Sequence, residues 1–407
     1  MKHLICAKTE LTGIWLRCMT FRDKERAIAM NHVQRIRCYL VNAGNSLYGI
    51  SPDYNAILRI DENRYKAYIE CIFPNVSLYE SNLYWAIAKV NKILVGIPCR
   101  TNNILLYDIQ EKKTAILKLN YLSCGHEYPV EFFYYCVCNN NIFILGTTIP
   151  MIIYLNVKEK KIEYLTNAYE QIVSIERYKS RYFFAGGCVQ IGKWLYVPLQ
   201  GYGAIMMVNI ITKSTELCFP ECDMDGYEGI NKIGTEVCLL GRKGKYHYLA
   251  FWNPENNKAH INKIPYEGET DLWAAFWPPV YYKSNIYLLP MSADHFFVMN
   301  MEEQEMRIEG RFDEFLEGCP LDQVKSKVMS VELSENILTF MTSFDSKWHK
   351  VNLDTGECSD YVVELVDKNY WRFYERDVCC REIEMKTIIP EGDITVNNYI
   401  DAIISKN

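Results

Sequence analysis

Apolar runs of about five residues, each bounded by turn-forming residues, follow one another along most of this sequence and predict short β-strands. A single aspartate or asparagine ends one strand of every repeat. These marker residues are Asp61, Asp108, Asn156, Asn209, Asn253, Asn300 and Asn352, and their separations are 47, 48, 53, 44, 47 and 52 residues. That period is typical of a four-stranded propeller blade and is too long for most helical solenoids.

Each repeat contains four apolar runs, which in the first repeat are RIRCYLV (35–41), LYGIS (47–51), AILRID (56–61) and YKAYIECI (65–72). Seven such repeats predict an all-β fold, a seven-bladed β-propeller of four-stranded antiparallel blades over residues 35–365. Residues 1–34 then form an N-terminal segment and residues 366–407 a C-terminal extension. An open row of blades would expose two sheet edges, so the ring should close. Residues 13–21 and 371–385 are both candidates for the closing strand, and the sequence does not choose between them.

The seven marker residues have an explanation that needs no ligand. Where a strand enters a tight turn, an Asx side chain can accept hydrogen bonds from backbone N–H groups about two residues further on. Seven occurrences at one blade position therefore predict seven similar turns between third and fourth strands.

The C-terminal extension has a helical period instead. Its apolar residues Val396, Tyr399, Ile400, Ile403 and Ile404 follow a spacing of three and four, which predicts a short amphipathic helix over residues 394–405. Such a helix is too short to be stable alone in water, so its apolar stripe should dock on this propeller, on a partner or on a second copy. Loss of an oligomer on deletion of residues 392–407 would indicate an assembly role.

The amino-acid composition restricts the fold class, the partners and the cellular location that we expect for this protein. Tyr, Phe and Trp number 30, 17 and 8, which favours strands. The net charge of −6, with both signs interspersed, argues against a nucleic-acid partner. We expect neither a signal peptide nor a membrane span, and therefore a cytoplasmic location. The 16 cysteines fall mostly within apolar strand patterns, so we expect reduced, buried thiols.

Binding residues are expected on the loops that join second to third strands and one blade to the next. The longer loops combine tyrosine with glutamate and are followed in one case by two tryptophans, an arrangement that suits a peptide, a sugar-like ligand or a cationic group. The alternative is tyrosines that pack over the blade ends beside solvated glutamates. The residues in question are Tyr79-Glu80, Glu127-Tyr128, Tyr169-Glu170, Tyr227-Glu228, Tyr266-Glu267, Trp273 and Trp277.

Some shorter loops carry polar or aromatic residues about five positions before the marker, where equivalent positions in each blade could converge on the channel mouth. They include Asn103, His247, Asp294, His295 and Trp348. Of these, His247, Asp294 and His295 are the candidates for a catalytic site, and Asn103 and Trp348 for a ligand or partner site. The alternative for each is a polar loop residue that faces solvent.

Signals for metals and cofactors are weak. The run Glu221-Cys222-Asp223-Met224-Asp225-Gly226 alternates oxygen ligands as a calcium loop does, but Lys232 stands at the position that needs a bidentate glutamate. Cys124 and His126 lack the further ligands of a zinc site. Neither a phosphate-binding loop nor another cofactor motif is present. The sequence therefore predicts no metal and no cofactor.

Hairpins such as NKILVGIPCRTNNILLYDIQEKKTAILKL and NNNIFILGTTIPMIIYLNVKEKKIEYL give residues 35–365 a pattern that resembles kelch-type propellers and the related galactose-oxidase-like domain. The resemblance implies a seven-bladed ring with a face that binds a ligand or a protein. No motif matches the copper ligands of galactose oxidase.

Two functions are compatible with these patterns. The first is a non-catalytic cytoplasmic propeller that binds a protein or peptide through its aromatic and acidic loops. The second is an enzyme of the lyase, hydrolase or cyclase type, with a small-molecule site at the channel mouth.

Overall fold

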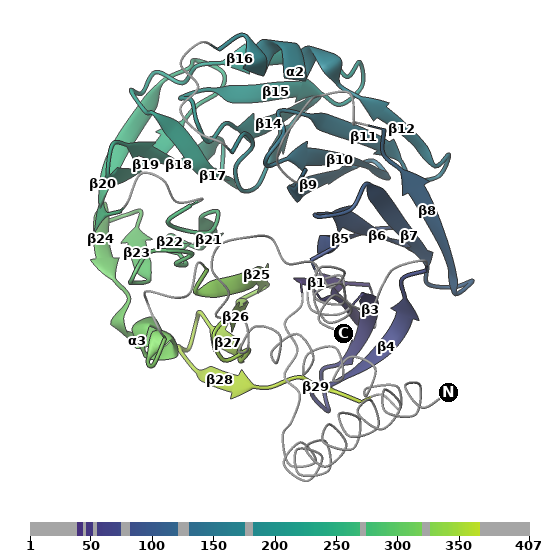
Figure 1. Cartoon of the computed structure of the whole chain (residues 1–407). Coiled ribbons are helices and arrows are strands. Elements are labelled where there is room, and N and C mark those ends of the chain that lie inside the picture. Colours follow the sequence, from purple (N-terminus) through teal and green to yellow (C-terminus); the bar gives the residue numbers. More distant parts are fainter. Residues whose placement is uncertain are drawn as a thin grey trace, which may run out of the picture.

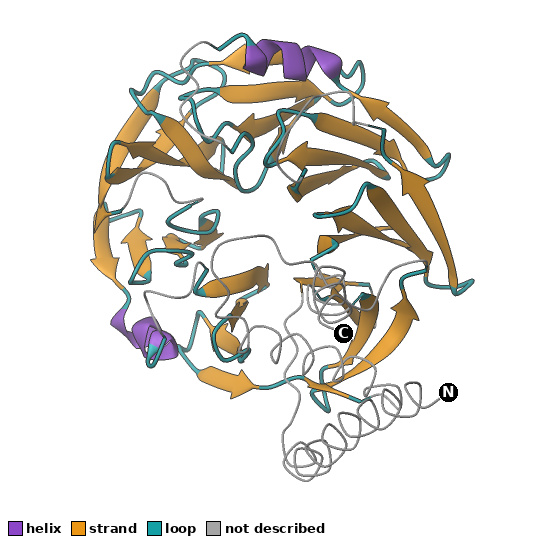
Figure 2. Ribbon diagram, in the orientation of Figure 1, coloured by secondary structure: helices purple, strands orange, loops and turns teal. Residues whose placement is uncertain are grey.

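The seven blades form a ring, as Figures 1 and 2 show, and the chain runs around it in order. The computed structural model describes residues 39–43, 46–51, 55–74, 82–120, 130–175, 182–268, 274–319 and 326–366. Blades one to four consist of β1 (Tyr39–Asn42), β2 (Leu47–Ile50), β3 (Ala56–Asp61) and β4 (Lys66–Ile72); β5 (Tyr84–Val90), β6 (Ile93–Pro98), β7 (Asn103–Asp108) and β8 (Lys113–Lys118); β9 (Phe132–Cys138), β10 (Asn141–Gly146), β11 (Ile152–Asn156) and β12 (Lys161–Tyr164); and β13 (Val189–Ile191), β14 (Trp194–Pro198), β15 (Ile205–Asn209) and β16 (Thr215–Cys218).

Blades five to seven consist of β17 (Gly226–Ile233), β18 (Glu236–Lys243), β19 (Tyr246–Trp252) and β20 (Ala259–Glu267); β21 (Val280–Tyr282), β22 (Asn285–Leu288), β23 (Phe297–Asn300) and β24 (Glu305–Ile308); and β25 (Val328–Ser334), β26 (Ile337–Thr342), β27 (Trp348–Asn352) and β28 (Cys358–Tyr361). Within each blade the four strands pair antiparallel in sequence order. The predicted fold class is therefore confirmed.

In the described part of the chain, helices occur only in the segments that connect one blade to the next. Helix α2 (Thr166–Val173) follows blade three, and α3 (Gly310–Asp313) with the 3₁₀ turn η2 (Glu314–Leu316) follows blade six. Helix α2 buries Ala168 and Ile172. The Tyr169-Glu170 pair, expected in a loop, lies in this helix. The predicted helix over residues 394–405 lies outside the described residues.

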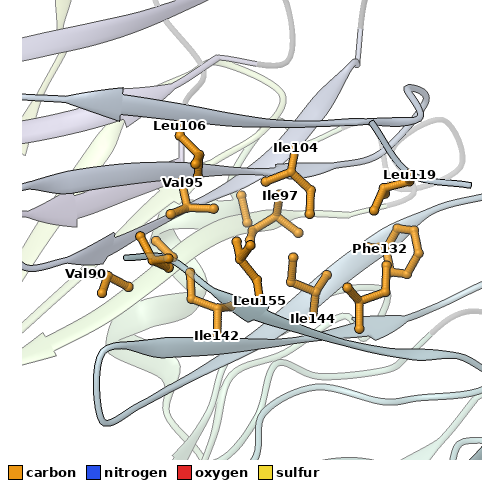
Figure 3. Packing of buried hydrophobic residues seen from close by; sticks show 14 of the residues in the cluster. Val90, Val95, Ile97, Ile104, Leu106, Leu119, Phe132, Ile142, Ile144 and Leu155 are labelled. Carbon is orange, nitrogen blue, oxygen red and sulfur yellow. The ribbon is translucent and has the colours of Figure 1, made fainter. Parts of the chain in front are cut away.

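The core is divided among the interfaces between blades. Seven clusters of buried apolar side chains are present, and each one joins two neighbouring blades, including blades seven and one. Figure 3 shows the cluster between blades two and three, where Val95 and Ile97 face Ile142 and Ile144. Because blades are covered on both sides, their second strands are buried almost throughout. This explains the continuous apolar runs of the sequence.

The ring is closed by a short fifth strand on blade one. After β28, the chain forms β29 (Glu364–Leu365), which pairs parallel with the outer strand β4. The side chains of Glu364 and Lys66 form an ion pair beside this pairing. Both segments proposed from sequence for closure, 13–21 and 371–385, lie outside the described residues.

The marker residues are turn caps in all seven blades, as predicted. In each blade the Oδ1 atom of the marker accepts one or two backbone N–H groups two or three residues further on, at 2.9 to 3.3 Å. The seven turns therefore share one design.

The same turns share a second feature that the sequence did not suggest. The residue four positions after each marker has a left-handed backbone, with φ between 51° and 74°. Six of the seven are not glycine: Tyr65, Lys112, Lys160, Lys213, Asn257 and Gln304, with Gly356 as the exception. A left-handed conformation costs a residue with a side chain roughly 1–2 kcal/mol, so the side chains need a compensating role.

In five of the six, the side chain contacts the preceding blade. Lys112 bonds to Glu70 of blade one, and Lys213 Nζ donates to Glu163 of blade three at 2.6 Å. The amide of Asn257 donates to the carbonyl of Phe219, and the ring of Tyr65 stacks on Tyr361. At the exception, the place of a Cβ on Gly356 is occupied by Arg311 of the connection after blade six.

These turns give a matched pair of substitutions. Lys160 is exposed, and no contact of its side chain with blade two is described. We expect Lys160→Gly to raise the free energy of unfolding by about 1 kcal/mol, because it relieves the left-handed strain. Lys112→Gly should raise it less or lower it, because the contact with Glu70 is lost. Urea denaturation measures both, and an equal gain in the two variants would contradict the role of the side chains.

Candidate functional site

The loops that join second to third strands lie on the same face of the ring as the starts of the first strands. This follows from the antiparallel register, in which Tyr84 pairs with Pro98 and Phe132 with Gly146. We call it the loop face. The capped turns lie at the other end of the strands, so the markers are separated from the loops where binding is expected.

A buried polar cluster lies just beneath the loop face in blade five. Glu228 and His247 are 3% and 1% exposed, and His247 Nε2 lies 3.3 Å from Glu228 Oε1. Arg242 Nε lies 4.0 Å from the same oxygen, and the other carboxylate oxygen accepts the backbone N–H of Ala275 at 2.9 Å. The structure thus brings together one residue predicted for partner binding, Glu228, and one predicted for catalysis, His247. Their contacts tie blade five to the connection that precedes blade six.

The other two catalytic candidates have different partners. His295 Nδ1 lies 2.8 Å from Asp313 Oδ2, and its side chain is 48% exposed. Asp294 accepts a hydrogen bond from the buried Lys327, whose ammonium also donates to the carbonyl of Ala293. Ring contacts run from His247 through two phenylalanines to His295. The two histidines are thus linked through rings, but His247, Asp294 and His295 each have a different polar partner: Glu228, Lys327 and Asp313.

Blade seven contains a polar relay that the sequence analysis missed. Thr342 Oγ1 lies 3.0 Å from His349 Nε2, and His349 Nδ1 lies 2.9 Å from Asp360 Oδ1. Burial lowers the pKa of His349, and the hydrogen bond to Asp360 opposes this effect. The order Thr, His, Asp is that of a hydrolytic triad. However, Thr342 is fully buried, and its hydroxyl also contacts Asp345, so this relay holds three strands and a loop together.

Several predicted partner-binding residues are core residues. Trp348 is 1% exposed within the cluster between blades seven and one, and Tyr227 is fully buried with its hydroxyl 3.2 Å from Cys222 Sγ. Asn103 is half-buried and donates to Thr101. Trp277 is also half-buried, and its indole N–H donates to the carbonyl of Val328 at 2.8 Å. Trp273 lies outside the described residues.

The aspartates of the turn before blade five, Asp223 and Asp225, both interact with other groups of the protein. Lys243 forms an ion pair with Asp223, and Asp225 Oδ2 accepts the backbone N–H of Gly244 at 2.7 Å. Within the described ranges, no group of three or more His, Cys, Asp or Glu side chains is arranged to hold a metal ion. No helix in that same part of the chain is long and apolar enough to cross a membrane.

An aromatic arc lies where the first strands of blades one to three begin, and its members are Tyr39, Trp85, Phe133 and Tyr134. Ring centroids are 5.6 Å apart for Tyr39 and Trp85, and 4.9 Å apart for Trp85 and Phe133. The last pair, Phe133 and Tyr134, is 6.5 Å apart. All four side chains are half-buried. Figure 1 shows β1, β5 and β9 as neighbouring first strands, in agreement with the contacts of β5 with β1 and β9.

The phenol of Tyr134 in the arc has a raised pKa. Burial raises the pKa of Tyr134, and the charge of Glu228 raises it further, so the phenol stays protonated near neutral pH. The charge of Glu228 in blade five therefore affects the ionisation of Tyr134 in blade three. Glu228 and Tyr134 both lie near the starts of first strands, and the carboxylate of Glu228 is contacted by Arg242 and His247.

No protein-family model matches this chain, and no curated protein matches it either. Among solved structures, it is similar to virginiamycin B lyase from Staphylococcus aureus, with 11% identity over 76% of this chain and 95% of that one and a TM-score of 0.54. It is also similar to BamB from Moraxella catarrhalis (7% identity, 82% and 89% covered, TM-score 0.49) and to the β-propeller domain of Cps50 (Swd1) from Myceliophteria thermophila (11% identity, 82% and 97% covered, TM-score 0.49).

At these identities the similarity shows the fold alone. The chain is a seven-bladed β-propeller, in agreement with its strand topology. The similar structures are varied propellers, and they do not assign the chain to the kelch type.

Proposed function

We propose that this protein is a non-catalytic binding protein that holds a protein or peptide partner against the aromatic arc on its loop face. The observation that carries the proposal is the arc itself: four adjoining, half-buried rings contributed by three successive blades. Aromatic side chains dominate the energetic centres of protein interfaces, since they bury much area and lose little conformational freedom. Propellers similar to this one are known from proteins with diverse partners and activities, so the site and not the fold must support the function.

Three buried polar groups near the loop face support the same proposal. Glu228, His247 and Thr342 are each less than 4% exposed, and each is engaged with neighbouring residues. A catalytic group must reach a substrate atom within hydrogen-bonding distance. These three instead connect strands and blades, and so they keep the loop face rigid.

Two further features remain part of the proposal. A cytoplasmic location is supported by the described cysteines, which are free thiols and in several cases buried. A kelch-type relationship is supported by the hairpin pattern of the blades.

Site-specific photo-crosslinking tests the proposed surface. A photoreactive benzoylphenylalanine at position 85 should capture a partner in the source cell, while the same group at position 261 should not. Ile261 is a suitable control because it is 50% exposed on the outer strand β20. The captured partner is then purified and its affinity measured by calorimetry.

With that purified partner, the double variant Trp85→Ala/Phe133→Ala should bind at least about tenfold more weakly, as expected for aromatic anchors. Ile261→Ala should bind within about twofold of the parent protein. Equal affinity of the arc variant and the parent would refute the proposed surface.

A further inference from the structure

We propose that this protein forms a symmetric dimer through the face that carries the seven capped turns, so that the partner on this face is a second copy of the chain. We call it the turn face. It lies at the opposite end of the strands from the loop face, and the dimer and the proposed function therefore do not depend on each other. The proposal rests on the charges of the turns, on one exposed apolar side chain and on the order of the blades.

The charges of the turns divide the turn face into two sides. In blade three, residues 156–161 contain three lysines and one glutamate, which gives a net charge of +2. In blade six, residues 300–305 contain three glutamates and no basic residue, which gives −3. The turn of blade four adds Lys213, that of blade seven adds Asp354 and Glu357, and the other three turns are neutral. Blades three and six lie on opposite sides of the ring (Figure 1), so the turn face has a basic side and an acidic side.

The central charges of both sides are available to a second molecule. Lys158 and Lys160 in blade three are exposed, and so are Glu303 and Glu305 in blade six. Within the described ranges, these four side chains form no hydrogen bond or ion pair. The left-handed lysines of blades two and four, in contrast, contact the preceding blade. Exposed, unpaired charges of opposite sign on one face are what a complementary interface requires.

The order of the blades allows a two-fold axis to bring the two sides together. In a dimer with this symmetry, both copies use the same surface, and every contact between two different blades occurs twice. Consider an axis in the plane of the turn face that passes between blades four and five and through blade one. It places blade three of one copy over blade six of the other, blade two over blade seven, and blade four over blade five. Each basic turn then faces an acidic or a neutral turn.

An exposed isoleucine lies close to this axis. Ile211, in the turn of blade four, is 72% exposed, more than any other large hydrophobic residue in the described part of the chain. Its backbone N–H donates to Oδ1 of the marker Asn209, which fixes the turn that presents it. In the dimer it faces the turn of blade five, where Pro254 follows the marker. Burial of this side chain favours association, and the symmetric dimer contains the contact twice.

The net charge of −6 determines the salt concentration at which the dimer should form. Two copies repel each other at long range, but at about 0.1 M salt this repulsion is largely screened beyond about 10 Å. Charges on facing turns lie closer together and keep their attraction. At about 1 M salt the screening length falls to about 3 Å, so we expect the dimer to weaken there.

Charge reversal on each side tests the interface. In sedimentation equilibrium at about 0.1 M salt, the parent protein should reach twice its monomer mass of 47.7 kDa. Lys158→Glu/Lys160→Glu and Glu303→Lys/Glu305→Lys should each raise the dissociation constant of the dimer at least about tenfold, because like charges then face each other. An equimolar mixture of the two variants should regain the dimer, since every facing pair in the mixed dimer has opposite charges. This recovery also shows that both variants are folded.

Two further variants separate the effect of position from that of charge. Lys118→Glu/Lys245→Glu makes the same change in net charge at the loop face, where Lys118 ends β8 and Lys245 lies in the turn between β18 and β19. Its dissociation constant should stay within about twofold of the parent value, because those charges are screened from the turn face. Ile211→Ser changes no charge and should weaken the dimer several-fold.

Three results would overturn the inference. The first is a parent protein that remains monomeric at about 0.1 M salt up to its highest soluble concentration. The second is a dimer that persists in both charge-reversed variants, or a mixture of them that stays monomeric, because the two sides would then not face each other. The third is an assembly of more than two copies, which a two-fold interface on one face cannot produce.

Discussion

Glu228→Gln should lower the free energy of unfolding by about 3–5 kcal/mol, the cost of removing one partner from a buried ion pair. The substitution keeps the size of the side chain and removes its charge. Arg242 would then keep its charge at 8% exposure without the carboxylate that lies 4.0 Å from its Nε atom. His247 would also lose the carboxylate oxygen 3.3 Å from its Nε2. Urea denaturation followed by tryptophan fluorescence measures the change.

Two controls identify the cause of this loss. Asp223→Asn removes an ion pair with Lys243 at the same end of the blade, but Asp223 is 87% exposed and the loss should be below about 1 kcal/mol. The double variant Glu228→Gln/Arg242→Met removes both charges, and it should recover part of the stability. A Glu228→Gln protein as stable as the parent would show that the cluster does not hold blades five and six together, and it would reopen Glu228 as a ligand-binding group.

The architecture could be predicted from the sequence because its signals are local. Each marker caps its own turn by accepting hydrogen bonds from backbone N–H groups two or three residues away, as Asp108 and Asn300 do. Such a turn can therefore be predicted from one short segment of sequence. Ring closure is different, because β29 is only two residues long and pairs with a strand about three hundred positions earlier. Nothing in the apolar pattern around Glu364 specifies that partner.

The aromatic arc was missed because it exists only after the ring forms. Tyr39, Trp85 and Phe133 lie 46 and 48 residues apart, one blade repeat each. A signal was nevertheless present: when the first strands of blades one to three are aligned, each begins with an aromatic residue. These rings belong to the strands that the loops enter and not to the loops themselves.

The opposite error affected residues near strand ends. The sequence predicts Tyr227 and Trp348 as binding residues because they adjoin loops, yet both are buried in interfaces between blades. In an ordinary sheet, alternation separates the buried face from the solvated one. Propeller blades are covered on both faces, so position along a strand gives little information about exposure.

Trp348 and Trp85 should therefore respond differently to truncation. Trp348→Ala should cost about 3–5 kcal/mol of unfolding free energy, because it leaves a cavity in a packed interface. Trp85→Ala should cost clearly less, because its side chain is half-buried and water can enter the space. Urea denaturation of both variants provides the comparison.

The indole N–H of Trp348 adds an internal control, since it is buried without a hydrogen-bond partner among the described residues. Trp348→Phe removes that donor and only part of the volume, so it should cost less than Trp348→Ala by about 2 kcal/mol. If Trp348→Ala is instead tolerated and weakens partner binding as Trp85→Ala does, then Trp348 belongs to the binding surface. The interface between blades seven and one would then have to open when the partner binds, because a side chain 1% exposed cannot otherwise contact it.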